Sequence, residues 1–251
     1  MLIAGLDLSA EPKGTALSVL EVSATRLKLR SLELGLRDAQ IVSAAAGVEK
    51  LGIDCALGWP LEFIDFLQQQ SNPKTQTKEF EGSIELRRTL AYRETDRMVR
   101  EVTKRWPLSV STDRLGMAAI RCAGLLSGIA ATGANASRAG EGLVVEVYPA
   151  ASMRIWQLDS AGYRNDADVR ARLLRDLCAA APWLEVSGHE ALLTESHDAF
   201  DSLVAALATL AVVVGHATKP PEHMLERARV EGWVHLPSAS LAEVFAAACS
   251  K

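Results

Sequence analysis

The sequence predicts an α/β fold: a mixed five-stranded sheet flanked by helices, with residues 1–251 in a single domain and a helical insertion at about residues 58–140. Three observations predict it. Short β-branched and aliphatic runs alternate with helix-like segments, the hydrophobic fraction of 49% suffices for a large core, and no repeat or linker divides the chain. The net charge of −4 means that any contact with nucleic acid depends on a local basic patch.

Three apolar runs open the chain, at residues 2–9, 15–21 and 26–34, and the short polar turns between them predict a three-strand meander. Residues 38–50 carry apolar side chains at helical spacing, and residues 52–57 favour a fourth strand. A crossover of this kind, from strand through helix to strand, places the new strand parallel to a neighbour.

Residues 58–82 contain GWP and QQQSNPKTQT, which predict a long irregular loop with one helical turn around residues 61–68. Such a loop beside an acid-bearing strand is either a substrate-binding lid or a variable surface insertion, and the sequence leaves both open. Residues 83–106 and 115–132 have helical composition, and residues 133–142 form a polar hinge.

Residues 143–148 predict the fifth strand and residues 169–180 a helix. Residues 196–215 predict the terminal helix, because Pro220 and Pro221 follow closely. The tail EGWVHLP is expected to form a short closing strand or turn.

The cysteines indicate a reducing compartment. Cys55, Cys122, Cys178 and Cys249 form no CxxC pair and have no histidine at zinc spacing, so we expect reduced packing residues. The N-terminus lacks a basic leader and a cleavage site, and no segment has the length and composition of a bilayer span. We therefore expect a cytoplasmic protein without a membrane partner, and the oligomeric state stays open.

Each of three apolar runs carries a single carboxylate: Asp7 in IAGLDLSA, Asp54 in LGIDCALGWP and Glu146 in GLVVEVYP. An ionised side chain in a buried strand is costly unless a positive charge meets it, so these acids suggest a shared partner such as Mg²⁺ or Mn²⁺. Ligands of open α/β sheets gather at the carboxyl ends of the strands. Asp7 and Asp54 could therefore face one point if their strands are neighbours.

Two further acids, Asp198 and Asp201, are spaced i, i+3 at the start of a helix and so share one helix face. An acid in a first helical turn is also favoured by the helix dipole without any catalytic role, which applies to Asp198, and Asp201 could form a surface ion pair. His197 precedes them as a helix-start residue, a proton shuttle or a hydrogen-bond donor next to a metal. With Asp7 and Asp54, these residues form the candidate catalytic set, and the four aspartates form the candidate metal ligands.

Glu146 lies between branched residues in VVEVYP, a pattern that predicts burial on both faces of the strand. It could bind a metal, or it could pair with an arginine, for which Arg93 and Arg121 are the candidates. The ion pair is the slightly favoured interpretation, and Glu146 is also a candidate substrate-binding residue.

A basic stripe is predicted on the helix of residues 83–106, where Arg93, Arg97, Arg100 and Lys104 recur at helical spacing. It is the one local basic feature large enough to meet a phosphate backbone, which makes Arg93 and Arg97 candidate substrate-binding residues. Acids four positions before arginines on the same helix are equally typical of an ordinary solvated helix.

The motifs GLDLSA, GIDCALGWP, VEVYPAA, HDAFDSLVAAL and EGWVHLP, in this order over residues 3–237, resemble the domain of unknown function 429 family, whose members are described as predicted nucleases of the ribonuclease H fold. RuvC-type junction resolvases of the same superfamily look similar in two ways: an aspartate in the first strand and a DxxD pair opening the last core helix. The resemblance implies that Asp7 is the first-strand acid, Asp54 the fourth-strand acid and Asp198 with Asp201 the helix pair. Glu146 has no counterpart in the resolvase pattern.

The resemblance also implies a mechanism. Two metal ions about 3.5–4 Å apart, held by the four aspartates, would activate a water on one side of a phosphodiester and stabilise the leaving oxygen on the other. His197 could assist proton transfer. The expectation is a nuclease that depends on Mg²⁺ or Mn²⁺ and acts on DNA or RNA.

Two alternatives remain. GLDLSA followed by Gly14 and Thr15 also resembles the first phosphate motif of actin-like and sugar-kinase ATPases, although such an enzyme needs a duplicated domain and a second glycine-rich loop. The other alternative is a non-catalytic ribonuclease H-like scaffold that binds a protein or a nucleic acid.

Overall fold

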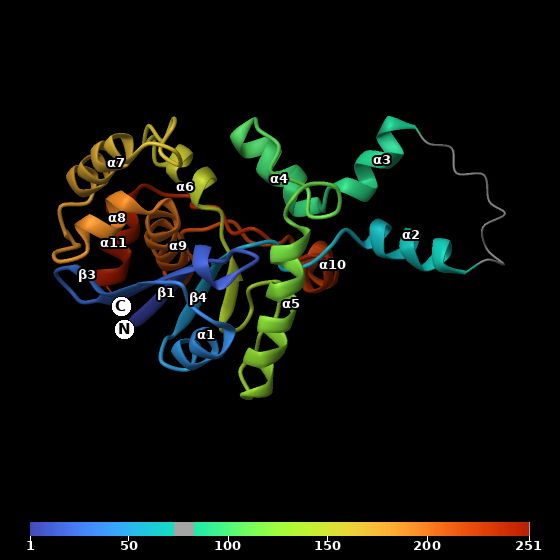
Figure 1. The fold of residues 1–251 in the computed structure, drawn as a ribbon, viewed down its shortest axis with the longest axis horizontal. Helices are drawn as coiled ribbons and strands as arrows, with labels where there is room; N and C mark the ends of the chain where they lie inside the picture. The colour runs from blue at the N-terminus through green and yellow to red at the C-terminus, as the bar shows by residue number, and fades with distance from the viewer. Residues whose placement is uncertain (73–82, 251) are drawn as a thin grey trace.

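The computed structural model describes residues 1–72 and 83–250 and contains a six-stranded mixed sheet in the order β5-β4-β1-β2-β3-β6 (Figure 1). The strands are β1 (Leu2–Asp7), β2 (Ala16–Val22), β3 (Leu27–Leu34), β4 (Lys50–Asp54), β5 (Val144–Glu146) and β6 (Leu184–Glu185). β1, β2 and β3 pair antiparallel as a meander, whereas β4 is parallel to β1, β5 to β4 and β6 to β3.

The predicted α/β class and a sheet flanked by helices are confirmed, but the predicted count of five strands is wrong. The sixth strand, β6, pairs with the beginning of β3 over only two residues. A strand this short has no alternating run of apolar residues, so the sequence pattern could not indicate it.

Eleven α-helices occur in the described part of the chain: α1 (Asp38–Ala45), α2 (Leu61–Ser71), α3 (Ile84–Ala91), α4 (Glu94–Thr103), α5 (Gly116–Ala131), α6 (Pro149–Ile155), α7 (Ala167–Ala180), α8 (Glu190–Glu195), α9 (His197–Val213), α10 (Leu225–Glu231) and α11 (Leu241–Cys249). α9 packs on one face of the sheet, over β1, β2 and β4, while α1 and α5 share a core with the other face. Among the described residues, no helix combines the length and the apolar composition that a membrane crossing requires.

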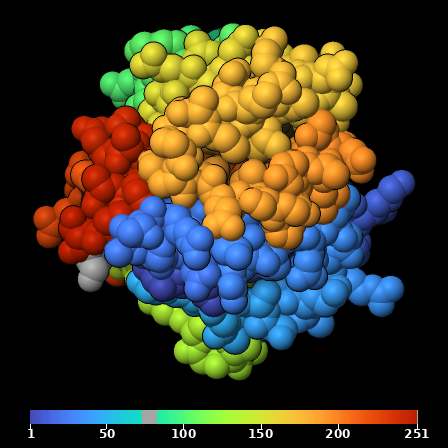
Figure 2. Space-filling model, turned by 90° about the vertical axis from the view of Figure 1, so that its left-hand side faces the viewer, coloured from blue at the N-terminus to red at the C-terminus, as the bar shows by residue number. Residues whose placement is uncertain are grey.

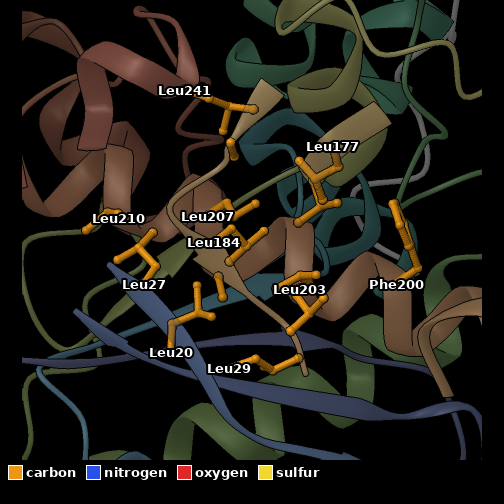
Figure 3. Close-up of a cluster of buried hydrophobic side chains, with 14 of the residues drawn as sticks. Leu20, Leu27, Leu29, Leu177, Leu184, Phe200, Leu203, Leu207, Leu210 and Leu241 are labelled. Atoms are coloured by element: carbon orange, nitrogen blue, oxygen red, sulfur yellow. The ribbon is translucent and has the colours of Figure 1, made fainter. Parts of the chain in front are cut away.

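The larger core lies between α9 and the meander (Figure 3). Leu20 and Leu29 extend from the strands toward Leu203 and Leu207 of α9, and all four side chains are at most 2% exposed. Burying a side chain of this size stabilises the fold by about 1.5–3 kcal/mol, which explains why the middle of α9 is apolar on all sides. Figure 2 shows the N-terminal strands beneath α7 and α8, with the C-terminal segment beside them.

The helix expected over residues 83–106 is wrong, because the chain breaks there into α3 and α4. Arg93 has an extended backbone with φ −69° and ψ 163°, and its N–H donates to the Asp96 carboxylate at 2.9 Å, which caps the start of α4. Lys104 ends α4 in the left-handed region with φ 61°. The predicted basic stripe is therefore not continuous.

The other differences are smaller. α2 has eleven residues where one helical turn was expected, and residues 73–82 of the expected loop lie outside the described residues. α9 is not the terminal helix, because α10 and α11 follow it. In the expected closing segment, Val234 bridges to Glu146 and Pro237 bridges to Ala217.

Candidate active site

Asp7 and Asp54 end the adjacent parallel strands β1 and β4, and their Cα atoms are register partners. Both strands run in the same direction, so both carboxylates stand at the same edge of the sheet. Local sequence patterns alone cannot show this, since it requires the pairing of strands more than forty residues apart in the chain.

Two glycines bring α9 onto this edge. Gly5 and Gly52 are register partners two residues before Asp7 and Asp54, so they point to the same face of the sheet. A Cβ atom at Gly5 would overlap the backbone of Ala206, and one at Gly52 would overlap the Thr209 hydroxyl. The missing side chains therefore allow α9 to lie directly on β1 and β4.

The first turns of α9 complete the acidic set. The Ser196 side chain caps the helix by accepting a hydrogen bond from the Ala199 N–H at 3.2 Å. Asp198 lies in the first turn, and its carboxylate is 3.0 Å from Nε2 of His197. This hydrogen bond raises the pKa of His197 above its usual value. Asp201 lies one turn further along, where it is 1% exposed.

Asp201 is held by the segment before α7. The Tyr163 hydroxyl lies 2.7 and 2.9 Å from its two carboxylate oxygens, and the Arg164 guanidinium lies 3.5 Å from one of them. Burial raises the pKa of Asp201 to about 6, although the Tyr163 hydrogen bond and the Arg164 and His197 charges oppose the rise. Burial and the Asp201 charge also raise the pKa of Tyr163.

The acidic side chains line one cavity of about 240 Å³. Its wall includes all four predicted aspartates, Asp7, Asp54, Asp198 and Asp201, together with His197, Glu146 and Arg93. Of the predicted site residues, Arg97 is the one that does not reach this wall. Residues far apart in the sequence therefore meet at the point where the sequence pattern placed a ligand.

The acids in the cavity repel one another. Burial and then the Asp54, Asp201 and Asp198 charges raise the pKa of Asp7 well above its usual range, and Arg164 alone opposes them. Burial and then the Asp201 charge raise the pKa of Asp54 in the same way. Such mutually raised pKa values indicate an excess of negative charge in a desolvated place.

The donor chemistry of this cavity fits a hard divalent cation, because carboxylate oxygens are its preferred ligands. The four aspartates supply these oxygens, and a positive charge would stabilise the ionised forms of Asp7 and Asp54. Within residues 1–72 and 83–250, however, no three acidic, histidine or cysteine side chains are close enough to hold a metal as they stand. The Asp201 oxygens face Tyr163 and the Asp198 carboxylate faces His197, so both helix acids have protein partners.

Glu146 forms the predicted ion pair, and its partner is Arg93. Two guanidinium nitrogens donate to its two oxygens at 2.7 and 2.9 Å, and both side chains are almost fully buried. The Leu57 N–H also donates to Glu146 at 3.1 Å. Burial raises the pKa of Glu146, although the charge and hydrogen bonds of Arg93 oppose the rise. Arg121 is instead 2.7 Å from Asp38 and is not the partner of Glu146.

Arg93 was predicted to contact substrate, and its geometry argues against that role. Its five N–H groups donate to Asp96, Glu146 and the Glu231 carbonyl oxygen, which leaves none for a phosphate. The side chain is 4% exposed. Arg97 is half-buried and pairs with Glu94 at 3.3 Å, as on an ordinary solvated helix.

The sequence pattern missed two residues of the cavity wall, Tyr148 and Arg164, and it missed Tyr163, which holds Asp201. Tyr163 and Arg164 lie in an irregular segment without periodicity, so no helix or strand face marks them. Tyr148 directly follows the VVEV run in the motif VEVYPAA, and its place just past β5 is the one signal that could have indicated it.

The comparisons with known proteins bear on the family of the chain. Searches of curated proteins and of solved structures give no match. The sequence profile of the family described as "Protein of unknown function (DUF429)" matches residues 5–226, a stretch that contains all four aspartates of the cavity. This match confirms the family that the five motifs resemble. The chain therefore belongs to the DUF429 family of proteins of unknown function.

Proposed function

We propose that this protein is a nuclease that depends on Mg²⁺ or Mn²⁺ and has a ribonuclease H-like fold. The observation that carries the proposal is the convergence of Asp7, Asp54, Asp198 and Asp201, from two strands and one helix, on a single cavity. The ribonuclease H-like assignment is supported by the resemblance of the motifs and by acids at the carboxyl ends of β1 and β4.

Asp7 and Asp54 would hold the metal, since the charge balance of both is unfavourable without a cation. Asp198 and Asp201 would complete the acidic set from the side of α9. A bound divalent metal supplies Lewis-acid stabilisation of a phosphodiester and a more acidic water.

The remaining residues act through position and charge. Arg164 has a half-exposed guanidinium at the cavity wall, where it would attract a phosphate. His197 is 40% exposed and hydrogen-bonded to Asp198, so it would be able to move a proton at the cavity mouth. Tyr163 orients Asp201 and fixes its place.

The test is a cleavage assay with labelled single-stranded and structured DNA and RNA, in Mg²⁺, in Mn²⁺ and in EDTA. The wild type is expected to cleave at least one substrate with either metal and none in EDTA. Asp7→Asn is expected to lower cleavage at least about 100-fold, because it removes a metal ligand. Asp176→Asn is the matched control, since Asp176 is an exposed acid of α7 outside the cavity.

Calorimetric titration with Mn²⁺ separates the outcomes. Heat of binding in the wild type that is absent in Asp7→Asn supports the metal site. Asp7→Asn removes one of the mutually repelling acids, so its melting temperature is expected to be higher than that of the wild type. A melting temperature at or above the wild-type value excludes misfolding as the cause of inactivity. Equal Mn²⁺ binding by both proteins contradicts the proposal, and metal binding without cleavage favours the non-catalytic scaffold.

A further inference from the structure

A second cavity of about 690 Å³ lies beside the acidic cavity. The two share Tyr148 in their walls. Trp106 lines the second cavity, and the next residues, Pro107 and Leu108, line the first. Likewise, Gly162 lines the second cavity and Arg164 lines the first. The two cavities are therefore adjacent, and the second lies between the end of α4, α6 and the segment before α7; together they are called the groove.

The second cavity carries unpaired positive charge. Arg105 and Arg154 line it, both residues are exposed, and neither guanidinium has a hydrogen-bond or ion-pair partner in the described part of the chain. One acid, Asp159, also lines it, and this acid is 3.5 Å from Arg172. Arginine without an internal partner is available for a phosphate, in contrast to Arg93.

The same wall presents an aromatic ring. Trp106 is 41% exposed, and its ring stacks on Tyr92 with a centroid separation of 4.2 Å and an interplanar angle of 26°. The stack holds the indole in position while part of it stays open to solvent. An exposed, fixed aromatic ring beside arginines is the arrangement on which an unpaired nucleobase stacks.

We propose that this groove binds single-stranded nucleic acid, with a base stacked on Trp106 and backbone phosphates on Arg105 and Arg154. The inference rests on the proposed nuclease function and defines its substrate: the strand would continue past Tyr148 to the acidic cavity. A paired base has no free face for Trp106, so the groove selects single strands over duplex. The backbone phosphates and stacked bases are common to DNA and RNA, and the assay includes both.

Binding is measured without cleavage, by fluorescence anisotropy in EDTA over a range of KCl concentrations. The probes are labelled oligo(dT), oligo(U) and a DNA duplex. Each is about 20 nucleotides long, which exceeds a typical single-strand site. The wild type is expected to bind at least one single strand more tightly than the duplex. Trp106→Ala is expected to weaken that binding roughly tenfold or more, whereas Trp106→Phe keeps a stacking ring and retains most of it.

The double variant Arg105→Ala/Arg154→Ala tests the phosphate contacts. It is expected to weaken binding and to reduce the slope of log affinity against log salt by about 1.4, or about 0.7 for each lost contact with a single strand. Arg26→Ala/Arg30→Ala removes the same charge from exposed arginines on or beside β3 and is expected to leave the slope nearly unchanged.

Three results would overturn the inference: equal affinity for duplex and single strand, wild-type affinity in Trp106→Ala, or an equal loss in the Arg26→Ala/Arg30→Ala control. These results are distinct from failure of the nuclease proposal. Binding with the predicted losses but no cleavage in any metal leaves the groove intact and removes the nuclease. Cleavage by the wild type, together with wild-type affinity in the groove variants, supports the nuclease and removes the groove.

Discussion

Asp201 illustrates how a buried carboxylate can stay unfavourable even with good hydrogen bonds. Tyr163 donates to it and Arg164 lies close by, yet burial raises its pKa to about 6. The net effect favours the protonated form, so at neutral pH the ionised side chain costs stability. The Arg164 guanidinium at 3.5 Å does not bring this pKa back to its usual range, so a further positive charge in the cavity would stabilise the ionised form of Asp201.

The pH dependence of stability follows from this pKa. An acid with a pKa of 3.8 when unfolded and about 6 when folded contributes most stability below pH about 4, and this contribution is lost as the pH rises to about 6. We predict that the free energy of unfolding of the wild type, relative to Asp201→Asn, falls by about 3 kcal/mol over that range. Urea titrations at several pH values measure it, and a difference that does not change with pH would contradict the prediction.

At the scale of single residues, the acids were predictable and their partners were not. Asp7, Asp54 and Glu146 stand out because each is a charge inside an apolar run, and Glu146 was correctly expected to pair with an arginine. Tyr163 follows no such pattern, since its role depends on Asp201, which lies 38 positions away in the chain.

β1, β4 and α9 form a unit in which small residues decide the geometry of the site. Gly5 and Gly52 lie under α9, and the next residues on the same face are Asp7 and Asp54. The alternation that buries the apolar residues of each strand therefore also aims the two carboxylates toward the start of α9. A side chain at either glycine would move the helix that carries Asp198 and Asp201.

We predict that Gly5→Ala and Gly52→Ala each lower the free energy of unfolding by several kcal/mol, because the added methyl group overlaps α9. The obstacle at Gly52 is the side-chain hydroxyl of Thr209, so Gly52→Ala/Thr209→Ala is expected to recover part of the loss. The obstacle at Gly5 is backbone, and no single substitution on α9 removes it. Urea unfolding measures all three variants.

Gly35 provides the control for this prediction. A Cβ atom there would meet nothing within 4 Å, although its φ of +91° adds backbone strain to any substitution. Gly35→Asn is expected to cost less than Gly5→Ala, since asparagine tolerates positive φ better than most residues. A Gly5→Ala variant as stable as the wild type would show that α9 does not lie as close to β1 as described.

The elements themselves were predicted where periodicity is strong. The five strands and α9 appear within a few residues of their expected positions. The prediction of one helix over residues 83–106 was wrong because composition does not reveal a cap. Arginine favours helices, and only the tertiary structure shows that Arg93 caps α4 and forms a buried ion pair.

In the whole molecule, α10 connects the C-terminal part of the chain to the beginnings of α2 and α4. Glu231, the last residue of α10, is 1% exposed and accepts the Leu61 N–H at 2.9 Å and the Glu94 N–H at 3.0 Å. These are the first residues of α2 and α4, so one carboxylate caps both helices. Arg227 pairs with the same carboxylate at 2.8 Å.

We predict that Glu231→Ala destabilises the protein by about 2 kcal/mol, or about 1 kcal/mol for each lost cap. Hydrogen exchange should accelerate first in α2 and α4, because these helices lose the acceptor of their first N–H groups. Glu226→Ala is the matched control, since Glu226 lies on the same helix but its side chain is 85% exposed. Uniform acceleration over the whole molecule, or none, would contradict the prediction.

Local chemistry alone indicated the class of the fold, the positions of most strands and the four aspartates, because apolar periodicity and a charge within an apolar run are properties of consecutive residues. The tertiary structure decided everything that depends on contacts between distant residues: the two-residue sixth strand, the break before α4, the retention of Asp201 by Tyr163 and the capping of α2 and α4 by Glu231. Patterns of consecutive residues do not indicate which distant groups will meet in the folded chain. Hydrogen bonds between such distant groups determine the sixth strand, the position of Asp201 and the helix caps.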